Sequence, residues 1–479
     1  MLTMRRFQTA LFSILLLLSA CVPITPADNS SIGTPPSGLA GTPSATVTPV
    51  MAASNFIIQK EALRGVQVKV WHPYFGAEKS LFESQVEQFN KENEWGIIVS
   101  AEGKGNFNEL FLQTDAALKD EGYPHVAIAF PEHTLGWREA VVELNPYLSD
   151  AVYGISAIDR SDFANAIWIQ DEVDGKRYGL PAQRSARFLL YNQTWARELG
   201  FDSPPATPSE FEQQACAGNE ALRKDSDSKN DSLGGWLIEA DAMTSLSWLL
   251  AFDGGVQNAQ GYRFLAPNNI IAFRYLKVLQ QKGCAWMPSA DLSVYDRFAS
   301  RQALFATASL EELADQSRAF FVTGSKDEWT VLAFPGNKKD ALVVYGSSFI
   351  MFKSNDTTQL ASWLFMRWML SSDNQARWVR STGLFPLRSS TLDLLADYSK
   401  EHPQWASAVN LLSSGTPAPK LASWRVVRVM LGDGFRDMFD TIRHPDLTDG
   451  QVPLILRQMD VIAEELNRTN LTPTESQTP

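Results

Sequence analysis

The sequence has few of the residues that hold metals or build disulfide scaffolds. Its 479 residues include only 3 Cys and 5 His. No two histidines have the His-Glu-x-x-His spacing of a zinc site, and the cysteines show no zinc-module spacing. A chain of this length with 3 cysteines is not a disulfide-stapled mini-protein. We therefore expect neither a metal nor a cofactor.

The signatures of several other classes are missing as well. The chain has no Gly-x-Ser-x-Gly elbow and no Walker A loop. Lys and Arg number 42 against 54 Asp and Glu, a net charge of −12, which argues against nucleic acid as a partner. The paired carboxylates of a glycoside hydrolase have no fixed sequence spacing, so an exported carbohydrate-active enzyme using Glu132 and Asp241 stays open.

The first residues have the pattern of an export signal. Arg5 and Arg6 precede an apolar run over residues 10–18, which is too short for a permanent membrane span. The run ends in Leu18-Ser-Ala-Cys21, which resembles a bacterial lipobox. We expect a signal peptide over residues 1–20 and a lipid on Cys21 that anchors the protein to the outer face of the cell membrane. The alternative is a plain signal peptide with a chance cysteine.

Two segments have the composition of unfolded chain. Residues 21–60 are rich in Pro, Thr, Ser, Gly and Ala and predict a flexible tether. Residues 467–479 predict a disordered tail. In an exported protein, Cys216 and Cys284 either form a disulfide or remain two buried free thiols.

The body of the chain alternates strand and helix patterns. Residues 66–71, 96–100 and 125–130 predict strands, and residues 78–91 and 107–118 predict amphipathic helices between them. This βαβαβ order indicates an α/β fold with a mostly parallel sheet covered by helices on both faces. Ligands of such sheets bind beyond the carboxyl ends of the strands, where Trp71, His72, Tyr74 and Glu132 stand.

Several later segments carry a family resemblance. Residues 181–192 keep the spacing of a known signature ending in Tyr191-Asn192, although Phe188 occupies its usual small position. Gly234-Gly-Trp236, Ala333-Phe-Pro-Gly336, Tyr345-Gly346 and Gly383-Leu-Phe-Pro-Leu-Arg388 follow in the family order. Together with the lipobox and tether, this order resembles the family-1 extracellular solute-binding proteins of ABC importers, the group that contains maltose- and glycerol-phosphate-binding proteins.

The resemblance implies a two-lobed periplasmic-binding-protein fold of type II, each lobe a mostly parallel sheet flanked by helices. Lobe I would comprise residues 61–181 and 340–388, and lobe II residues 182–339 and 389–466. The chain would cross the hinge near residues 181–184, 343–346 and 385–386. A monomer would capture a solute between closing lobes and deliver it to separate permease subunits, without catalysis.

The ligand would be an oligosaccharide, a sugar or a polyol phosphate. A neutral sugar needs aromatic planes for its ring faces and polar side chains for its hydroxyls, whereas Arg184 and Arg187 leave an anionic ligand open. The resemblance carries a sugar-stacking role to Trp424. The candidate ligand-binding residues are Trp71, His72, Tyr74, Glu132, Gln183, Arg184, Trp236, Tyr345, Gly346 and Trp424.

Overall fold

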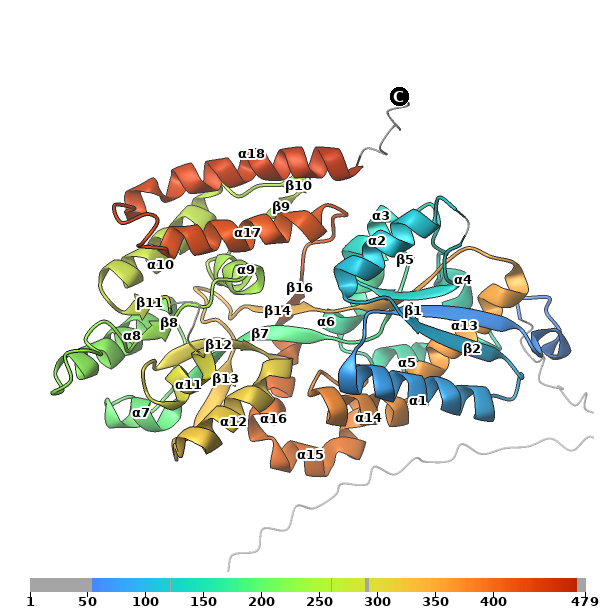
Figure 1. Ribbon diagram of the computed structural model, residues 1–479, viewed down its shortest axis with the longest axis horizontal. Coiled ribbons are helices and arrows are strands. Elements are labelled where there is room, and N and C mark those ends of the chain that lie inside the picture. The colour runs from blue at the N-terminus through green and yellow to red at the C-terminus, as the bar shows by residue number, and fades with distance from the viewer. Residues whose placement is uncertain (1–53, 121, 260, 289–292, 472–479) are drawn as a thin grey trace, which may run out of the picture. The chain divides into compact units, whose positions relative to one another are not determined.

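The computed structural model describes residues 54–120, 122–259, 261–288 and 293–471. The chain divides into residues 1–51 and residues 52–479, and the described residues all belong to the second unit. This unit contains two main sheets flanked by helices (Figure 1). The predicted signal peptide, Cys21 and most of the predicted tether lie outside the described residues.

The first sheet combines early strands with one late strand. Its order is β2-β1-β3-β15-β6. The bounds are β1 Gln67–His72, β2 Ile98–Gly103, β3 Val126–Ala129, β6 Leu180–Pro181 and β15 Ser348–Met351. β1 runs parallel to β2 and β3, which confirms the predicted βαβαβ start. The structure adds β15 and β6, which are antiparallel to their neighbours.

Helices connect the parallel strands of this sheet. α1 (Gly76–Glu92) lies between β1 and β2, and α2 (Phe107–Ala117) lies between β2 and β3. α1 buries Phe82, Val86 and Phe89, whose spacing places them on one helix face. β3 is buried at every position, as a strand covered on both faces must be.

The second sheet is centred on β7 (Ser185–Asn192), an eight-residue strand that is buried throughout. The sheet has the order β11-β8-β12-β7-β14-β16, with β13 also paired to β7. β7 is antiparallel to β12, β13 and β14, whereas β8–β11, β8–β12 and β14–β16 are parallel pairs. The bounds are β8 Trp236–Leu237, β11 Ala285–Trp286, β12 Phe305–Ser309, β13 Trp329–Leu332, β14 Leu342–Tyr345 and β16 Gly415–Pro417.

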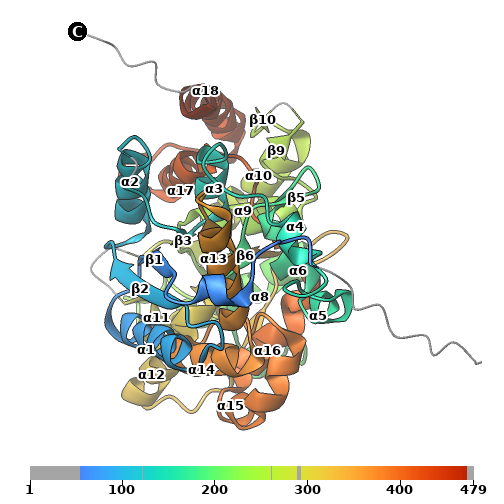
Figure 2. The same ribbon diagram turned by 90° about the vertical axis from the view of Figure 1, so that its right-hand side faces the viewer.

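The remaining elements are helices and two short hairpins. In two views, α17 and α18 lie at one end of the described unit and α15 and α16 at the other (Figure 1, Figure 2). No helix within the described ranges is long and apolar enough to cross a bilayer. The longer helices are α8 Pro208–Arg223, α9 Ala242–Ala251, α10 Pro267–Gln281, α12 Leu313–Thr323, α13 Asp356–Met369, α14 Ser372–Thr382, α16 Pro403–Leu411, α17 Trp424–Phe439 and α18 Val452–Leu471. The shorter elements are α3 Pro131–Gly136, α4 Asn145–Leu148, α5 Ala157–Ser161, α6 Asn165–Trp168, α7 Gln193–Glu198, α11 Val294–Ala299, α15 Ala396–Glu401, β4 Glu172–Val173, β5 Lys176–Arg177, β9 Gln257–Asn258 and β10 Gly261–Tyr262.

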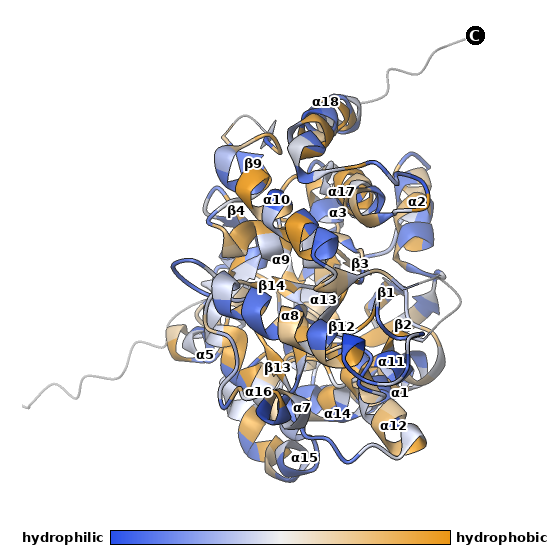
Figure 3. Ribbon diagram, turned by 90° about the vertical axis from the view of Figure 1, so that its left-hand side faces the viewer, coloured by the Kyte–Doolittle hydropathy of each residue, from blue (hydrophilic) through white to orange (hydrophobic). Residues whose placement is uncertain are grey.

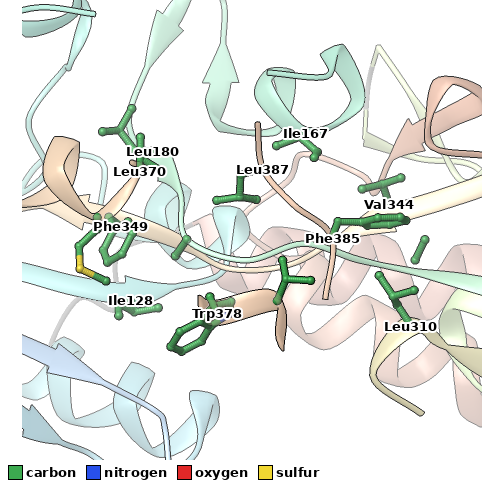
Figure 4. Packing of buried hydrophobic residues seen from close by; sticks show 14 of the residues in the cluster. Ile128, Ile167, Leu180, Leu310, Val344, Phe349, Leu370, Trp378, Phe385 and Leu387 are labelled. Atoms are coloured by element: carbon green, nitrogen blue, oxygen red, sulfur yellow. The ribbon is translucent and has the colours of Figure 1, made fainter. Parts of the chain in front are cut away.

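The chain passes between the sheets more than once. It leaves the first sheet between β6 and β7 and returns between β14 and β15. A buried hydrophobic cluster follows these passages from Ile128 and Phe349 of the first sheet to Val344 of the second (Figure 4). A separate cluster lies on the other face of the second sheet, so that Phe188 and Leu190 of β7 enter one core and Leu189 and Tyr191 the other.

Two predicted boundaries need correction. The segment 54–60, expected as tether, docks on the body: the backbone N–H of Asn55 donates to Asp150 Oδ2 (2.7 Å), and Phe56 stacks on Tyr147. The tail was expected from residue 467, but α18 continues to Leu471. The Asn467 side chain accepts a hydrogen bond from Ser423 Oγ (2.5 Å), which holds this last turn against α17.

A disulfide joins Cys216 of α8 to Cys284, just before β11, across a sequence separation of 68. Gly235 lies close against this link, because a side chain there would meet the Cys284 carbonyl. The bond therefore fixes α8 to the edge of the second sheet.

We predict that replacing both cysteines (Cys216→Ala with Cys284→Ala) lowers the free energy of unfolding by about 4 kcal/mol, because the unfolded chain loses a long covalent loop. Chemical denaturation of the wild type and the double variant, each with and without reductant, measures this effect. Reductant should remove the difference in unfolding free energy between the wild type and the double variant. Equal denaturation midpoints in the absence of reductant would contradict a stabilising disulfide.

Candidate ligand-binding cleft

Arg184 lies where the passages between the sheets meet. Its side chain is fully buried, and Nη2 lies 2.7 Å from Asp171 Oδ2. Nη1 donates to the backbone carbonyls of Gln183 and Ser347, and the Arg184 carbonyl accepts from the Phe385 N–H (3.0 Å). Burial lowers the Arg184 pKa and Asp171 opposes that shift. The predicted site residues Gln183 and Arg184 therefore lie at the hinge, in contact with all three predicted crossings.

Gly346 joins β14 to β15 beside Arg184. Its φ of +147° is rare for residues with a side chain, and a Cβ atom there would lie 2.2 Å from the Gln183 carbonyl oxygen. The two crossing segments approach this closely because the N–H groups of Ala182 and Gln183 both donate to the Ser347 carbonyl. Glycine is thus required at this position by backbone packing.

A narrow cavity of about 30 Å³ lies beside the hinge, between the ends of β3, β14, β16 and α17. Several predicted site residues from distant parts of the sequence meet there, as expected for side chains that follow carboxyl ends of strands. These are Glu132, Tyr345, Gly346 and Trp424. Its other lining residues are Phe130, Pro131, Gln170, Met243, Ala418, Pro419, Lys420 and Arg428.

Glu132 is the buried carboxyl group of this cavity. Burial raises its pKa, while Arg428, its own backbone and Arg425 oppose the shift. Arg428 Nε lies 3.9 Å from Glu132 Oε1. Trp424 is 1% exposed and stacks on Tyr262 with ring centroids 6.4 Å apart, so only an edge of its indole is open to a ligand.

Next to the cavity, Arg187 of β7 holds a group of carboxylates. Its guanidinium lies 2.6 Å from Glu239, 3.1 Å from Asp241 and 2.9 Å from Glu312. These carboxylates raise the Arg187 pKa against the effect of its burial. Their side chains remain 27–35% exposed, so they present oriented acceptor oxygens. Tyr345 Oη donates to Ser309 Oγ (2.8 Å), which also accepts from Arg187 and connects the group to the cavity.

Arg184 and Arg187 had been considered as partners for an anionic ligand. Both guanidinium groups are engaged by carboxylates of the protein itself, Asp171 for the first and Glu239, Asp241 and Glu312 for the second. A bound anion would have to displace these ion pairs.

Other predicted residues lie outside the cavity lining. Trp71 is 6% exposed, donates from Nε1 to Glu102 Oε2 (3.0 Å) and is covered by Lys104. His72 Nδ1 accepts from the Tyr74 N–H (3.2 Å), and burial lowers the His72 pKa to about 4. Tyr74 packs on Phe82 and Trp378 in the core.

Trp236 is another of the predicted ligand-binding residues. The structure places it in β8, fully buried between Phe211 and Trp248. The glycines before it serve close packing, since Gly235 leaves no room for a side chain beside the Ala215 and Cys284 carbonyls.

Sequence reasoning did not select several residues that line the cavity, notably Phe130, Lys420 and Arg428. Phe130 directly follows β3, so its position beyond a strand end was a usable signal. Lys420 donates to the backbone carbonyls of Ile169 (2.6 Å) and Glu172 (2.8 Å). That contact joins segments 248 residues apart or more, which no local pattern reveals.

A family model described as bacterial extracellular solute-binding protein matches residues 84–411 of the chain. The chain belongs to this family. The resemblance seen in the sequence is thereby confirmed, and the matched range includes strands of both sheets around the cavity of this solute-binding protein.

Curated relatives agree with the family assignment. A binding protein of Brucella abortus (strain 2308) is 24% identical over 282 residues, which cover 57% of this chain and 66% of the relative. The match thus spans just under two thirds of that relative's length. The sn-glycerol-3-phosphate-binding periplasmic protein UgpB of Escherichia coli (strain K12) is 22% identical over 400 residues, covering 79% of this chain and 89% of the relative.

Solved structures establish the fold. The sugar-binding protein MalE from Xanthomonas citri has a TM-score of 0.71 at 20% identity and covers 84% of this chain and 98% of its own. UgpB from Mycobacterium tuberculosis, solved with glycerophosphocholine, has a TM-score of 0.66 at 16% identity and covers 85% and 99%. The predicted two-lobed α/β fold is confirmed. The expectation of a mostly parallel sheet in each lobe needs correction, because β15 is antiparallel to both of its neighbours and β7 is antiparallel to β12, β13 and β14.

We predict that Gly346→Ala destabilises the protein by about 1–3 kcal/mol, because its Cβ would press on the Gln183 carbonyl. Thermal or chemical unfolding measures the change. Gly136→Ala is the matched control, since nothing lies within 4 Å of a Cβ there. Equal stability of the two variants would show that the hinge backbone adapts to a side chain at position 346.

Proposed function

We propose that this protein captures a carbohydrate-type solute outside the cytoplasm and delivers it to the permease of an ABC importer. The observation that carries the proposal is the cavity that joins Glu132, Tyr345 and Trp424 beside the passages between the two sheets. Family membership supports solute binding, and the printed names of relatives include both sugar and glycerol-phosphate binders.

The chemistry of the cavity favours a ligand with many hydroxyl groups. Glu239, Asp241 and Glu312 are partly exposed and held in place by Arg187, so they offer fixed acceptors for hydroxyl hydrogens. Phe130 and Tyr345 supply aromatic surface, and the buried Trp424 lines the same cavity. An oligosaccharide or sugar fits this combination best. A polyol phosphate would use its hydroxyls in the same way and meet Lys420 or Arg428 with its phosphate.

Capture would proceed by closure of two lobes around the solute. The proposed lobes are residues 61–181 with 340–388 and residues 182–339 with 389–466. The arrangement of strands supports this division, because β1, β2, β3, β6 and β15 share one sheet and β7 begins the other. Closure would be a hinge motion about the segments packed on Arg184.

A glycoside hydrolase using Glu132 and Asp241 is the alternative that the sequence left open. Asp241 is bound to Arg187, and its Oδ1 also caps α9 by accepting from the Met243 N–H (2.6 Å). These contacts engage both oxygens of the carboxylate with groups of the protein itself. The arrangement supports binding and gives no support to a general acid or nucleophile at this position.

We predict that Glu132→Gln weakens binding of the cognate solute about tenfold or more, because a hydroxyl loses a charged acceptor. Titration calorimetry with oligosaccharides, monosaccharides and glycerol 3-phosphate measures the affinity. Glu139→Gln, at an exposed position of the same part of the fold, is the control and should bind as the wild type does. Equal affinity of both variants would remove Glu132 from the site, and chemical turnover of any sugar would contradict the capture function.

We further propose that lipid on Cys21 anchors the protein to the outer face of the bacterial cell membrane, with a signal peptide over residues 1–20. The support is the sequence Leu18-Ser-Ala-Cys21 after an apolar run. In a bacterial host fed labelled palmitate, the wild-type chain should carry the label and fractionate with membranes, and Cys21→Ser should do neither. A labelled Cys21→Ser variant would contradict this anchor.

A further inference from the structure

A groove lies between α17 and α18 on one side and α2 and α3 on the other. It encloses about 840 Å³, a volume typical of small-molecule sites. Most of its wall is apolar and comes from Val426, Val429 and Met430 of α17 and Met459 and Ile462 of α18. Both helices carry hydrophobic and hydrophilic stretches (Figure 3).

Two of these apolar side chains are open to solvent. Val429 is 60% exposed and Ile462 is 46% exposed. A contiguous apolar surface of this kind on a soluble unit marks a place that binds something. The acidic residues at the rim, Asp433 and Asp437, are paired with Arg436 (3.3 Å) and Arg443 (3.2 Å). Their charge is therefore balanced outside the groove.

One end of the groove is polar and positively charged. Arg425 and Arg428 both line it, and their guanidinium groups lie over the rings of Phe111 (4.3 Å) and Phe130 (4.9 Å). In the part of the chain that the structure describes, Arg425 has no carboxylate within ion-pair distance, and its polar contact is a 3.5 Å hydrogen bond to Asn470 Oδ1. These positive groups lie at the boundary between the two sides of the groove.

His133 reaches the same end of the groove from α3. It is 1% exposed and lines the groove, and its Nδ1 atom is buried without a hydrogen-bond partner among the described residues. Burial, with smaller contributions from Arg428 and Arg425, lowers the His133 pKa to about 3. The ring is therefore neutral and adds no positive charge to that of the two arginines.

The groove lies next to the solute cavity. Arg428 lines both of them. Phe130 of the cavity stacks on Phe107 of the groove with ring centroids 4.2 Å apart. Arg428 and the Phe107–Phe130 pair therefore form the wall between the cavity and the groove.

We propose that the groove takes the apolar tail of an amphipathic anion, whose negatively charged group lies against Arg425, Arg428 and His133. The inference rests on the proposed solute-binding function and narrows its ligand class: an anionic group such as a phosphate ester at the arginines, and an alkyl or aryl tail between α17 and α18. Such a molecule requires positive charge beside its anionic group and apolar walls around its tail, and the groove offers both.

The test is a chain-length series of n-alkyl phosphates from butyl to octyl, all below their micelle concentrations, titrated into the whole protein. Binding should tighten about tenfold for every two methylene groups added, because each enters an apolar wall. n-Octyl glucoside, which has the tail without the charge, should bind more weakly than n-octyl phosphate.

Matched variants locate the two halves of the site. Val429→Asp should abolish the chain-length dependence, whereas Val461→Asp, equally exposed on α18 but outside the groove lining, should keep it. Arg425→Gln should remove the preference for phosphate over glucoside, and Arg457→Gln, exposed on α18, should retain it. Unchanged folding of each variant is checked by its unfolding midpoint.

The outcomes separate this inference from the function it rests on. Solute binding without any chain-length dependence overturns the amphiphile and leaves sugar capture intact. Failure of all alkyl phosphates to bind also overturns it. Binding of alkyl phosphates without binding of any sugar supports the groove and contradicts a purely carbohydrate ligand.

Discussion

The buried ion pair between Arg184 and Asp171 is the interaction on which the arrangement of the two sheets depends. Arg184 contacts the first passage through its own segment, the second through the Ser347 carbonyl and Ser348 Oγ, and the third through the Phe385 N–H. Removal of one partner of such a pair leaves an uncompensated buried charge, at a cost of about 3–5 kcal/mol. The pair therefore acts as a fixed pivot between the crossing segments. The close approach of the Gly346 backbone to the Gln183 carbonyl holds the same segments together.

The chemistry of the cleft follows from that pivot. Because β14 and β15 meet at Gly346, the end of β14 lies beside the end of β3, and Tyr345 and Glu132 reach the same cavity. β7 leaves the pivot in the other direction and carries Arg187, which orients Glu239, Asp241 and Glu312. The passages of the chain around Arg184 thus place the buried carboxyl group of Glu132 near the partly exposed carboxylates that Arg187 holds.

The sequence predicted site residues well where their place in the cavity follows from their position along a strand. It predicted them less well where the surroundings of a side chain depend on which strands pair. Glu132, Tyr345 and Trp424 meet in the cavity; the first follows a strand end, and the resemblance pointed to the other two. Trp71 also stands at a strand end, but pairing of β1 with β2 brings Glu102 beside its indole. Trp236 shows that a glycine pair before a tryptophan does not predict a ligand-binding position. Here the glycines allow close packing of the backbone beside a fully buried indole. The Arg187 group brings together carboxylates that are far apart in the sequence, and no periodicity or spacing in the sequence predicts it.

β7 has a consequence for how this protein can change over evolutionary time. Its alternate residues belong to different cores, Phe188 and Leu190 to the one shared by both sheets and Leu189 and Tyr191 to the one beneath α9, α10 and α17. A substitution on one side of the strand therefore changes the packing of one core and leaves the packing of the other core unchanged. The outer core, which packs against α17 and contains Trp424, can therefore accept substitutions while the inner core keeps the packing around Arg184 unchanged.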